Sequence, residues 1–428
     1  MKIALLGYEI ENASAYRYLA TKYPEAEFTI YDQSDEPRTE IPEGVGFVGG
    51  LANFYDIDAD LLVRTPGVAP YKIKSDAPVT TATKLFFEAC TLPVIGVTGS
   101  KGKGTTSSLI ASILRAAGKT VWLVGNIGAP ALDILSTASE GEFVVYELSS
   151  FQLWDLDRSP QTAVVLMIEP EHLDVHMDID DYISAKANIA RYQKEGDRTI
   201  YNVDNAYSEE IARLGEGGVI AYPDTQTAHI DGGRFYYGET EICSVDVLQL
   251  PGEHNRENAL AAIDAVWPWV SEPDTIANGL RYFEGLPHRL KFVAEIDGVR
   301  YYDDSIATTP GSAIAAIRSF NEPKVLILGG SSKGAEFHEL AREVKNGNVR
   351  HIILIGDEAP RIQTALDQVG FHHYTNLGTP DMPTIVDAAR EHAASGGVVI
   401  LSPACASFGM FKNYSDRGDQ FIHAVNRM

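Results

Sequence analysis

The sequence predicts an α/β protein in which mostly parallel sheets are divided among three domains. Its 428 residues correspond to about three domains of average length. Short apolar runs typical of buried strands alternate along the chain with segments of helical periodicity, as they do in proteins with parallel sheets. Polar or glycine-rich residues follow many of these runs, and parallel sheets bind ligands at that end of their strands. We therefore expect the ligand sites at strand ends.

Charge and composition restrict the class of partner. A net charge of −24 and a pI of about 4.8 oppose nonspecific binding to nucleic acid or to anionic membranes, because both are negatively charged. The 3 cysteines contain no CxxC pair and indicate reduced thiols. No apolar run reaches the roughly 18 residues of a membrane span, and the N-terminal run is too short for a signal peptide. We expect a cytoplasmic monomer that binds neither nucleic acid nor membrane.

The first predicted domain, residues 1–91, begins with a β-α-β unit. Its strand, helix and second strand are predicted over residues 2–6, 13–20 and 28–31. Gly7 lies at the first turn and Asp32 at the tip of the second strand, as in Rossmann-like domains. The loop at residues 7–12 lacks the full GxGxxG pattern, so a mononucleotide or nucleotide-sugar site is at least as well supported as a dinucleotide site. Alternatively, Asp32 is an ordinary exposed acid.

A glycine-rich loop begins the second predicted domain, residues 92–286. The segment GVTGSKGKGTT at residues 96–106 lies between an apolar run and an amphipathic helix, which is the order of a P-loop. Backbone N–H groups of such a loop bind phosphate, and Lys103 adds a charge for the outer phosphates. Because Gly104 follows Lys103, the hydroxyl for magnesium is displaced, and we prefer Thr105 to Thr106. The predicted phosphate-binding residues are Gly99, Ser100, Lys101, Gly102, Lys103, Gly104 and Thr105.

Two further strands of this domain end in acidic residues. Glu147 directly follows the apolar run 142–146, and the cluster at residues 169–176, EPEHLDVH, follows the run 162–168. A carboxylate at a strand tip beside a P-loop can hold magnesium, and carboxylates with phosphates suit magnesium or manganese better than zinc. We predict Glu147 and His172 as metal ligands. The alternative is a solvated loop acid and a surface histidine.

Asn255 and Asn258 lie at the start of a predicted alanine-rich helix. Side-chain amides can pair with both edges of an adenine, but asparagines also cap helices. Lys186 lies inside a helix predicted over residues 179–191, and its residue type alone indicates a solvated surface position.

The third predicted domain, residues 287–428, is again α/β with a mostly parallel, Rossmann-like sheet. Its strands are predicted over residues 299–303, 324–328, 351–355 and 397–401, each followed by polar or glycine-rich residues or by a turn. A helix is predicted to begin at Pro310, where proline is favoured.

Three motifs carry a resemblance to a known family. They are YELSSFQL at residues 146–153, GLPHR at residues 285–289, and SPACASFGMFKNYSDRGDQF at residues 402–421. With the P-loop, they make the chain similar to the Mur ligases over nearly its whole length, and least so in residues 1–91. The resemblance implies an ATP-dependent ligase of cytoplasmic peptidoglycan precursor synthesis. It would add glutamate, with a preference for D-Glu, to UDP-N-acetylmuramoyl-L-alanine through an acyl phosphate, with two Mg²⁺ ions or Mn²⁺ in their place.

The resemblance also implies roles for single residues. Residues 1–91 would bind the UDP-sugar, residues 92–286 ATP, and residues 287–428 glutamate. Lys186 matches a lysine that the family carbamylates; the carbamate would support the metal site with Glu147 and His172, and Lys103, His172 and Lys186 would be catalytic. The remaining implied contacts are Asn255, Asn258, Arg289 and Asp304 for ATP, Asp32 and Asn126 for the muramyl substrate, and Thr308, Lys333, Ser407 and Tyr414 for glutamate.

Some residues depart from the family pattern and keep alternatives open. Gly104 resembles the folylpolyglutamate synthase variant of the P-loop, although that family generally lacks a domain before it. Ile306 stands where a lysine is usual and Ser331 where an acid is common, so ligation of L-Glu is a second alternative. A P-loop NTPase acting as a switch or motor is a third, but it would not need the residues after 286.

Overall fold

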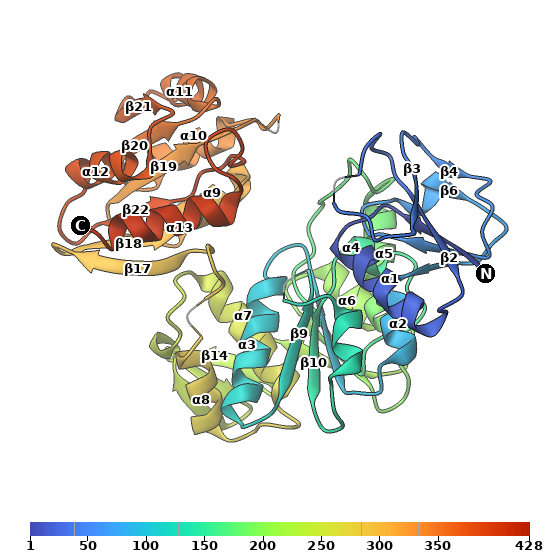
Figure 1. Cartoon of the computed structure of the whole chain (residues 1–428). Coiled ribbons are helices and arrows are strands. Elements are labelled where there is room, and N and C mark those ends of the chain that lie inside the picture. Colours follow the sequence, from blue (N-terminus) through green and yellow to red (C-terminus); the bar gives the residue numbers. More distant parts are fainter. Residues whose placement is uncertain (38, 127, 284, 333) are drawn as a thin grey trace. The chain divides into compact units, whose positions relative to one another are not determined.

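The computed structural model describes the whole chain except residues 38, 127, 284 and 333 (Figure 1). The chain forms two compact units: residues 1–247 with 257–282, and residues 248–256 with 283–428. The first unit contains two large parallel sheets and two smaller sheets, and the second contains one mostly parallel sheet. The predicted α/β class with mostly parallel sheets is confirmed. The predicted first domain and most of the second share one unit, so the boundaries at residues 91 and 286 stay predictions.

The N-terminal sheet has the strand order β3-β2-β1-β5-β7, and every neighbouring pair is parallel. Its strands are β1 (Lys2–Leu6), β2 (Glu27–Tyr31), β3 (Gly46–Val48), β5 (Leu61–Arg64) and β7 (Val79–Thr81). The helices are α1 (Ile10–Lys22) and α2 (Ala82–Ala89). The predicted β-α-β opening is confirmed, with Gly7 in the left-handed region (φ 75°) directly after β1. A two-stranded sheet, β4 (Phe54–Tyr55) with β6 (Ile73–Lys74), completes this part.

The central sheet has the order β13-β12-β11-β8-β10-β9 and is wholly parallel. Its strands are β8 (Val94–Thr98), β9 (Val121–Gly125), β10 (Phe143–Glu147), β11 (Thr162–Val165), β12 (Arg198–Asn202) and β13 (Gly218–Tyr222). Every residue of β8, β10 and β11 is buried, as expected where helices cover both faces of a sheet. Because the chain leaves β8 on one side and later returns on the other, the P-loop lies at a topological switch point, where such sheets bind ligands.

Four helices follow strands of this sheet, after β8, β10, β11 and β12. They are α3 (Lys103–Ala116), α4 (Ser150–Leu153), α5 (Ile179–Arg191) and α6 (Ala206–Ala212). The strand predicted over residues 162–168 already ends at Val165. The next residues turn toward the P-loop instead, where Met167 O accepts a hydrogen bond from Ser100 N (2.9 Å). The predicted bounds of α5 agree with the structure.

A three-stranded antiparallel sheet in the first unit was not predicted. It consists of β14 (Ala228–Asp231), β15 (Arg234–Tyr237) and β16 (Thr240–Ser244), and it precedes α7 (Glu253–Val266) and α8 (Pro273–Arg281). Ala228 N donates to Asp264 Oδ1 (3.0 Å), which fastens the first of these strands to α7. Its short strands are separated by turns, and its stability depends on this packing.

The second unit has the strand order β17-β18-β22-β19-β20-β21. Its strands are β17 (Lys291–Ile296), β18 (Val299–Asp303), β19 (Lys324–Gly329), β20 (Val349–Ile355), β21 (Tyr374–Gly378) and β22 (Val398–Leu401). Only β17 is antiparallel to its neighbour. Two apolar clusters cover the faces of the sheet, together with α9 (Pro310–Arg318), α10 (His338–Asn346), α11 (Ala359–Gln368), α12 (Met382–His392) and α13 (Tyr414–Val425). Among the described residues, no helix has the length and apolarity that a membrane span requires.

Candidate active site

The P-loop has the backbone that its glycines require. Gly102 is the N-cap of α3 and adopts the left-handed conformation (φ 84°), and a Cβ atom there would lie 2.4 Å from Asn258 Oδ1. A Cβ atom on Gly99 would lie 2.7 Å from the Cβ atom of Leu166. No side chain fits at either position, so the loop keeps its backbone N–H groups and the start of a 14-residue helix available to an anion.

Lys103 and Ser100 hold this loop in place. Lys103 Nζ donates to the carbonyl oxygens of Gly99 (3.0 Å) and Ser100 (2.8 Å). Ser100 Oγ donates to Glu169 O (2.8 Å) and accepts from Glu169 N (2.9 Å). Because the only proton of the Ser100 hydroxyl goes to Glu169 O, Tyr182 must be the donor in the 2.8 Å contact between the hydroxyl groups of Tyr182 and Ser100. The loop is therefore fastened both to the acidic segment after β11 and to α5.

The two candidate hydroxyls for magnesium are both buried in the first turn of α3. Thr106 is 0% exposed, and its Oγ1 donates to Asn258 Oδ1 (3.2 Å). Thr105 is 5% exposed. The contact accounts for the Thr106 hydroxyl and is compatible with Thr105 as the metal ligand, which stays a prediction. Asn255 donates through Nδ2 to Pro251 O (2.7 Å), so part of its amide supports the turn before α7.

Glu147 is the last residue of β10 and is 3% exposed. In the sheet register it lies opposite Val97, one residue before the end of β8. The neighbouring Leu148 donates through its N–H to Val97 O (2.9 Å) and accepts from Thr98 Oγ1 (2.8 Å). The structure thus places this carboxylate beside the start of the P-loop, as predicted.

Lys186 is buried, contrary to what its place in a helix indicated by itself. Its Nζ donates to Gly99 O (2.9 Å), makes a longer contact with Thr98 Oγ1 (3.4 Å), and lies 4.7 Å from the centre of the Tyr182 ring. Burial, and after it the charge of Lys103, holds the pKa of Lys186 well below its ordinary value, and the acids Glu147 and Glu171 only partly oppose this. A lowered pKa increases the share of the neutral, nucleophilic amine, which is the form that carbamylation requires.

His172 lies on the loop after β11 in a left-handed conformation (φ 56°). Its side chain is 46% exposed, 3.9 Å from Glu171 Oε2, and its ring lies 5.0 Å from that of Phe151. Among the described residues no group of three or more His, Cys, Asp and Glu side chains could hold a metal ion. Magnesium usually takes one or two protein carboxylates and completes its shell with phosphates and water, so the buried Glu147 beside a P-loop fits this ion. A ligand role for His172 stays a prediction.

Reasoning from the sequence missed Tyr182, which joins the P-loop to α5. A signal was present, because Tyr182 precedes Lys186 by four residues and such pairs share a helix face. It also missed the hydrogen-bonded network of Ser150, His176 and Asp181.

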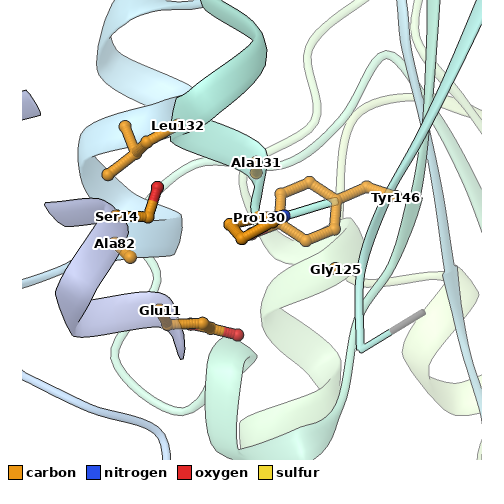
Figure 2. Close-up of a pocket in the computed structure, with 8 residues that line it drawn as sticks. All are labelled: Glu11, Ser14, Ala82, Gly125, Pro130, Ala131, Leu132 and Tyr146. Atoms are coloured by element: carbon orange, nitrogen blue, oxygen red, sulfur yellow. The ribbon is translucent and has the colours of Figure 1, made fainter. Parts of the chain in front are cut away.

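The predicted muramyl-substrate residues lie at the ends of β2 and β9. Asp32 Oδ1 accepts from Ser34 N (2.8 Å), and Asn126 is exposed directly after Gly125. Near Gly125 is a cavity of about 10 Å³, barely enough for one water molecule. Figure 2 shows Glu11 reaching toward it from α1, with Pro130 and Tyr146 on the opposite side.

Glu11 belongs to the loop that departs from the nucleotide-binding pattern. Burial raises the pKa of its carboxyl group to about 7, and Gln152 Nε2 donates to Oε1 at 2.5 Å. This contact joins α1 to α4 within the first unit. Glu11, a residue of the loop that lacks the GxGxxG pattern, thus contacts the segment that follows Glu147.

In the second unit, polar side chains cluster after β18 and β22. Asp304 accepts from Ser402 Oγ (2.7 Å) and Leu290 N (3.1 Å), and burial raises the pKa of its carboxyl group to about 7. His288 Nδ1 lies 2.7 Å from Asp303 Oδ2. A Cβ atom on Gly418 would lie 2.1 Å from that nitrogen, so only glycine fits beside this pair.

Arg417 is fully buried at the start of α13 and joins the loops on either side of it. It donates to Ser305 Oγ (2.9 Å), Ser305 O (2.7 Å), Cys405 O (3.3 Å) and Ala406 O (3.4 Å). The loop after β18 continues to Thr308, and the loop after β22 continues to Ser407. Arg417 was quoted within a motif but not predicted as a site residue, because its burial is a tertiary property.

The remaining predicted residues of this unit follow the same loops. Ser407 is 3% exposed, Thr308 is half-buried, and Tyr414 is 40% exposed and accepts through its backbone oxygen from Ser305 Oγ (2.8 Å). Arg289 lies close enough to Asp304 for its charge to oppose the rise in the pKa of that carboxyl. Lys333 lies outside the described residues.

Comparison with known proteins agrees with this arrangement. A family model for the Mur ligase middle domain matches residues 97–266, and one for the Mur ligase glutamate ligase domain matches residues 288–405. The chain is 36% identical to the UDP-N-acetylmuramoylalanine--D-glutamate ligase of Clostridium tetani over 100% of its own length and 97% of that protein. It is also 36% identical to the enzyme of the same name from Acetivibrio thermocellus, over 99% and 96%.

A solved structure extends the comparison to the fold. The UDP-N-acetylmuramoylalanyl-D-glutamyl-2,6-diaminopimelate--D-alanyl-D-alanyl ligase from Acinetobacter baumannii superposes with a TM-score of 0.62 at 17% identity, over 99% of this chain and 93% of that one. The P-loop, its parallel sheet and the matching domains define an ATP-dependent ligase. The chain belongs to the Mur ligase family.

Proposed function

We propose that this enzyme joins D-glutamate to UDP-N-acetylmuramoyl-L-alanine at the expense of ATP, in peptidoglycan precursor synthesis. The observation that carries the proposal is the full-length similarity to ligases of that name, which includes residues 1–91. A folylpolyglutamate-type ligase, suggested by Gly104, generally lacks such a domain. The proposed domains are residues 1–91 for the UDP-sugar, 92–286 for ATP and 287–428 for glutamate.

The first half-reaction would use the P-loop. The alanyl carboxylate attacks the γ-phosphorus of ATP and ADP leaves, which forms an acyl phosphate. Lys103 is folded onto the loop carbonyls of Gly99 and Ser100, and its amine can turn from them to the outer phosphates. The backbone N–H groups held open by Gly99 and Gly102 supply further donors.

Glu147, Thr105 and a carbamylated Lys186 would hold magnesium, with His172 at a second ion. Bound magnesium would offset the negative charge on the phosphates during transfer. The buried amine of Lys186 suits carbamylation: its nitrogen forms a bond to the carbon of CO2 and loses a proton, which converts a neutral side chain into an anion. Tyr182 lies beside this amine and is hydrogen-bonded to Ser100, so it would keep the carbamate in a fixed position relative to the P-loop.

The second half-reaction would use the loops after β18 and β22. Thr308, Ser407, Tyr414 and Lys333 would bind the two carboxylates of glutamate, and its amine attacks the acyl carbon and expels phosphate. Hydroxyl groups and one lysine make charge-assisted hydrogen bonds to carboxylates. Such a site rejects a neutral amino acid, because its own polar groups would be left unpaired.

Phosphate release measured with UDP-N-acetylmuramoyl-L-alanine and, in turn, D-Glu, L-Glu and D-Ala tests the proposal. We expect release with D-Glu, far less with L-Glu and none with D-Ala. Preference for L-Glu would overturn the stereochemical part, and preference for D-Ala would overturn the acidic-site assignment. Release that needs no amino acid would indicate an NTPase instead. Activity with a reduced folate in place of the nucleotide sugar would favour the folylpolyglutamate alternative.

A further inference from the structure

The side chains proposed to support the metal come from three separate segments of the first unit. Glu147 ends β10 and is followed by α4, His172 lies on the loop at residues 169–178, and Lys186 lies in α5. The backbone hydrogen bonds of the central sheet fix the end of β10, but they do not extend to the loop at residues 169–178 or to α5. Side-chain contacts must therefore set their relative positions.

A relay of three side chains makes those contacts: Ser150 and His176 are buried, and the side chain of Asp181 is 14% exposed. Ser150 Oγ lies 3.0 Å from His176 Nε2, and His176 Nδ1 lies 3.1 Å from Asp181 Oδ2. A carboxylate only accepts, so Nδ1 carries the proton and Nε2 accepts from the serine hydroxyl. The relay thus runs in one direction, from α4 through the loop to α5.

Asp181 is the point at which all three segments meet. Its Oδ1 accepts from Trp154 Nε1 (3.0 Å), directly after α4, and its Oδ2 also accepts from Met177 N (3.2 Å) in the loop. The His176 ring packs with centroids 4.0 Å from the Trp154 ring and 5.3 Å, nearly parallel, from the Phe151 ring. Few alternative positions are open to a histidine packed and bonded in this way.

The loop transmits this position to His172. His176 N donates to His172 O (2.9 Å), which closes one turn of backbone between the two histidines. Asp181 is followed by Tyr182, whose hydroxyl donates to Ser100 in the P-loop. Displacement of His176 would therefore move His172 directly and the end of α5 that faces the P-loop through Asp181.

Hydroxyl, imidazole and carboxylate occur here in the order of a hydrolase triad. However, Ser150 and His176 are each only 2% exposed, so no substrate can reach the hydroxyl. We propose that Ser150, His176 and Asp181 are positioning residues that align Glu147, His172 and Lys186 for magnesium and ATP. This inference rests on the proposed function of those three residues.

Ser150→Ala tests the relay, because it removes one buried hydroxyl and little volume. In the full-length enzyme we expect the Mg²⁺ concentration for half-maximal phosphate release to rise about ten-fold, as when a residue supporting a metal ligand is lost. The KM for D-Glu should not change. His176→Asn keeps a donor for Asp181 and loses the contact with Ser150, so it should show the same rise. The double variant should need no more Mg²⁺ than either single variant, because both substitutions remove the same hydrogen bond, between Ser150 and His176.

The matched control is His229→Asn, on β14. His229 also makes one ring-nitrogen contact, to Thr227 O (3.1 Å), and stacks on an aromatic ring, that of Tyr236. Its Mg²⁺ requirement should equal that of the wild type. An unchanged Mg²⁺ requirement in folded Ser150→Ala would overturn the inference, and so would labelling of Ser150 by a fluorophosphonate, which reacts with catalytic serines.

Glu147→Gln separates this inference from the proposed function. If this variant keeps the wild-type Mg²⁺ dependence, the assignment of the metal site is wrong, whatever Ser150→Ala does. If it loses that dependence while folded Ser150→Ala keeps it, only the positioning role is wrong.

Discussion

A buried lysine in the first unit, Lys186, and a buried arginine in the second, Arg417, both lie near strand ends proposed to bind substrate, and the two differ in their partners. Lys186 in the first unit has one short hydrogen bond, to Gly99 O, and one long one. Arg417 in the second unit donates to four different acceptors. Burial lowers the pKa of both, well below the ordinary range for Lys186 but only to about 10 for Arg417.

The difference separates a reactive group from a structural one. The pKa of a buried cation with few acceptors falls, because desolvation outweighs the remaining contacts. Arg417 keeps its charge, since the planar guanidinium can satisfy several acceptors at once. We therefore expect Lys186 to be available for the proposed carbamylation, whereas Arg417 joins two loops. Three experiments examine this contrast.

The largest effect is expected for Lys186→Ala, which removes the amine that we propose to be carbamylated. Ligation should fall about a hundred-fold or more, because the metal site would lose an anion. A short carboxylic acid should restore part of the activity, and depletion of CO2 should lower that of the wild type. Lys186→Arg, which stays charged, should be inactive and should not respond to the acid. A fully active Lys186→Ala enzyme would end the idea of a reactive lysine.

Arg417→Met should act on stability rather than on chemistry. It leaves buried acceptors at Ser305, Cys405 and Ala406 without their donor, and we expect a loss of about 2 kcal/mol in the free energy of unfolding. Urea unfolding measures this. Arg300→Met, which breaks a half-exposed pair with Glu322, should cost less than about 1 kcal/mol. Equal losses in the free energy of unfolding of the two variants would show that Arg417 contributes no more to stability than an ordinary surface ion pair.

Asp304→Asn tests the effect of a buried acid in the second unit on pH dependence. The folded-state pKa is raised from 3.8 to about 7, so the native protein binds more protons than the unfolded chain between these values. Stability should therefore fall as the pH rises through this window. The difference in the free energy of unfolding, variant minus wild type, should be about 1 kcal/mol or more higher at pH 8 than at pH 5. Urea unfolding at both pH values measures the difference, and an unchanged difference would contradict the assignment to Asp304.

Local pattern was sufficient for much of this protein. Apolar runs followed by glycine or polar residues identified β1, β8, β10 and β18, because strands buried on both faces leave this trace in the sequence. The P-loop was identifiable because its backbone excludes side chains at Gly99 and Gly102. Glu147 could be predicted for a related reason: a residue that directly follows a central parallel strand must lie at the ligand-binding edge of the sheet.

Only the tertiary structure decided the properties that depend on burial and on partners distant in sequence. Lys186 looks like a surface residue in its helix, and the lowering of its pKa comes from burial and then from the charge of Lys103, which is 83 residues earlier in the chain. The same is true of His176, whose partner Ser150 lies 26 residues earlier. A residue's type and spacing restrict where it can lie along a strand or helix, but its pKa depends on how much water and how many acceptors the folded chain leaves around it.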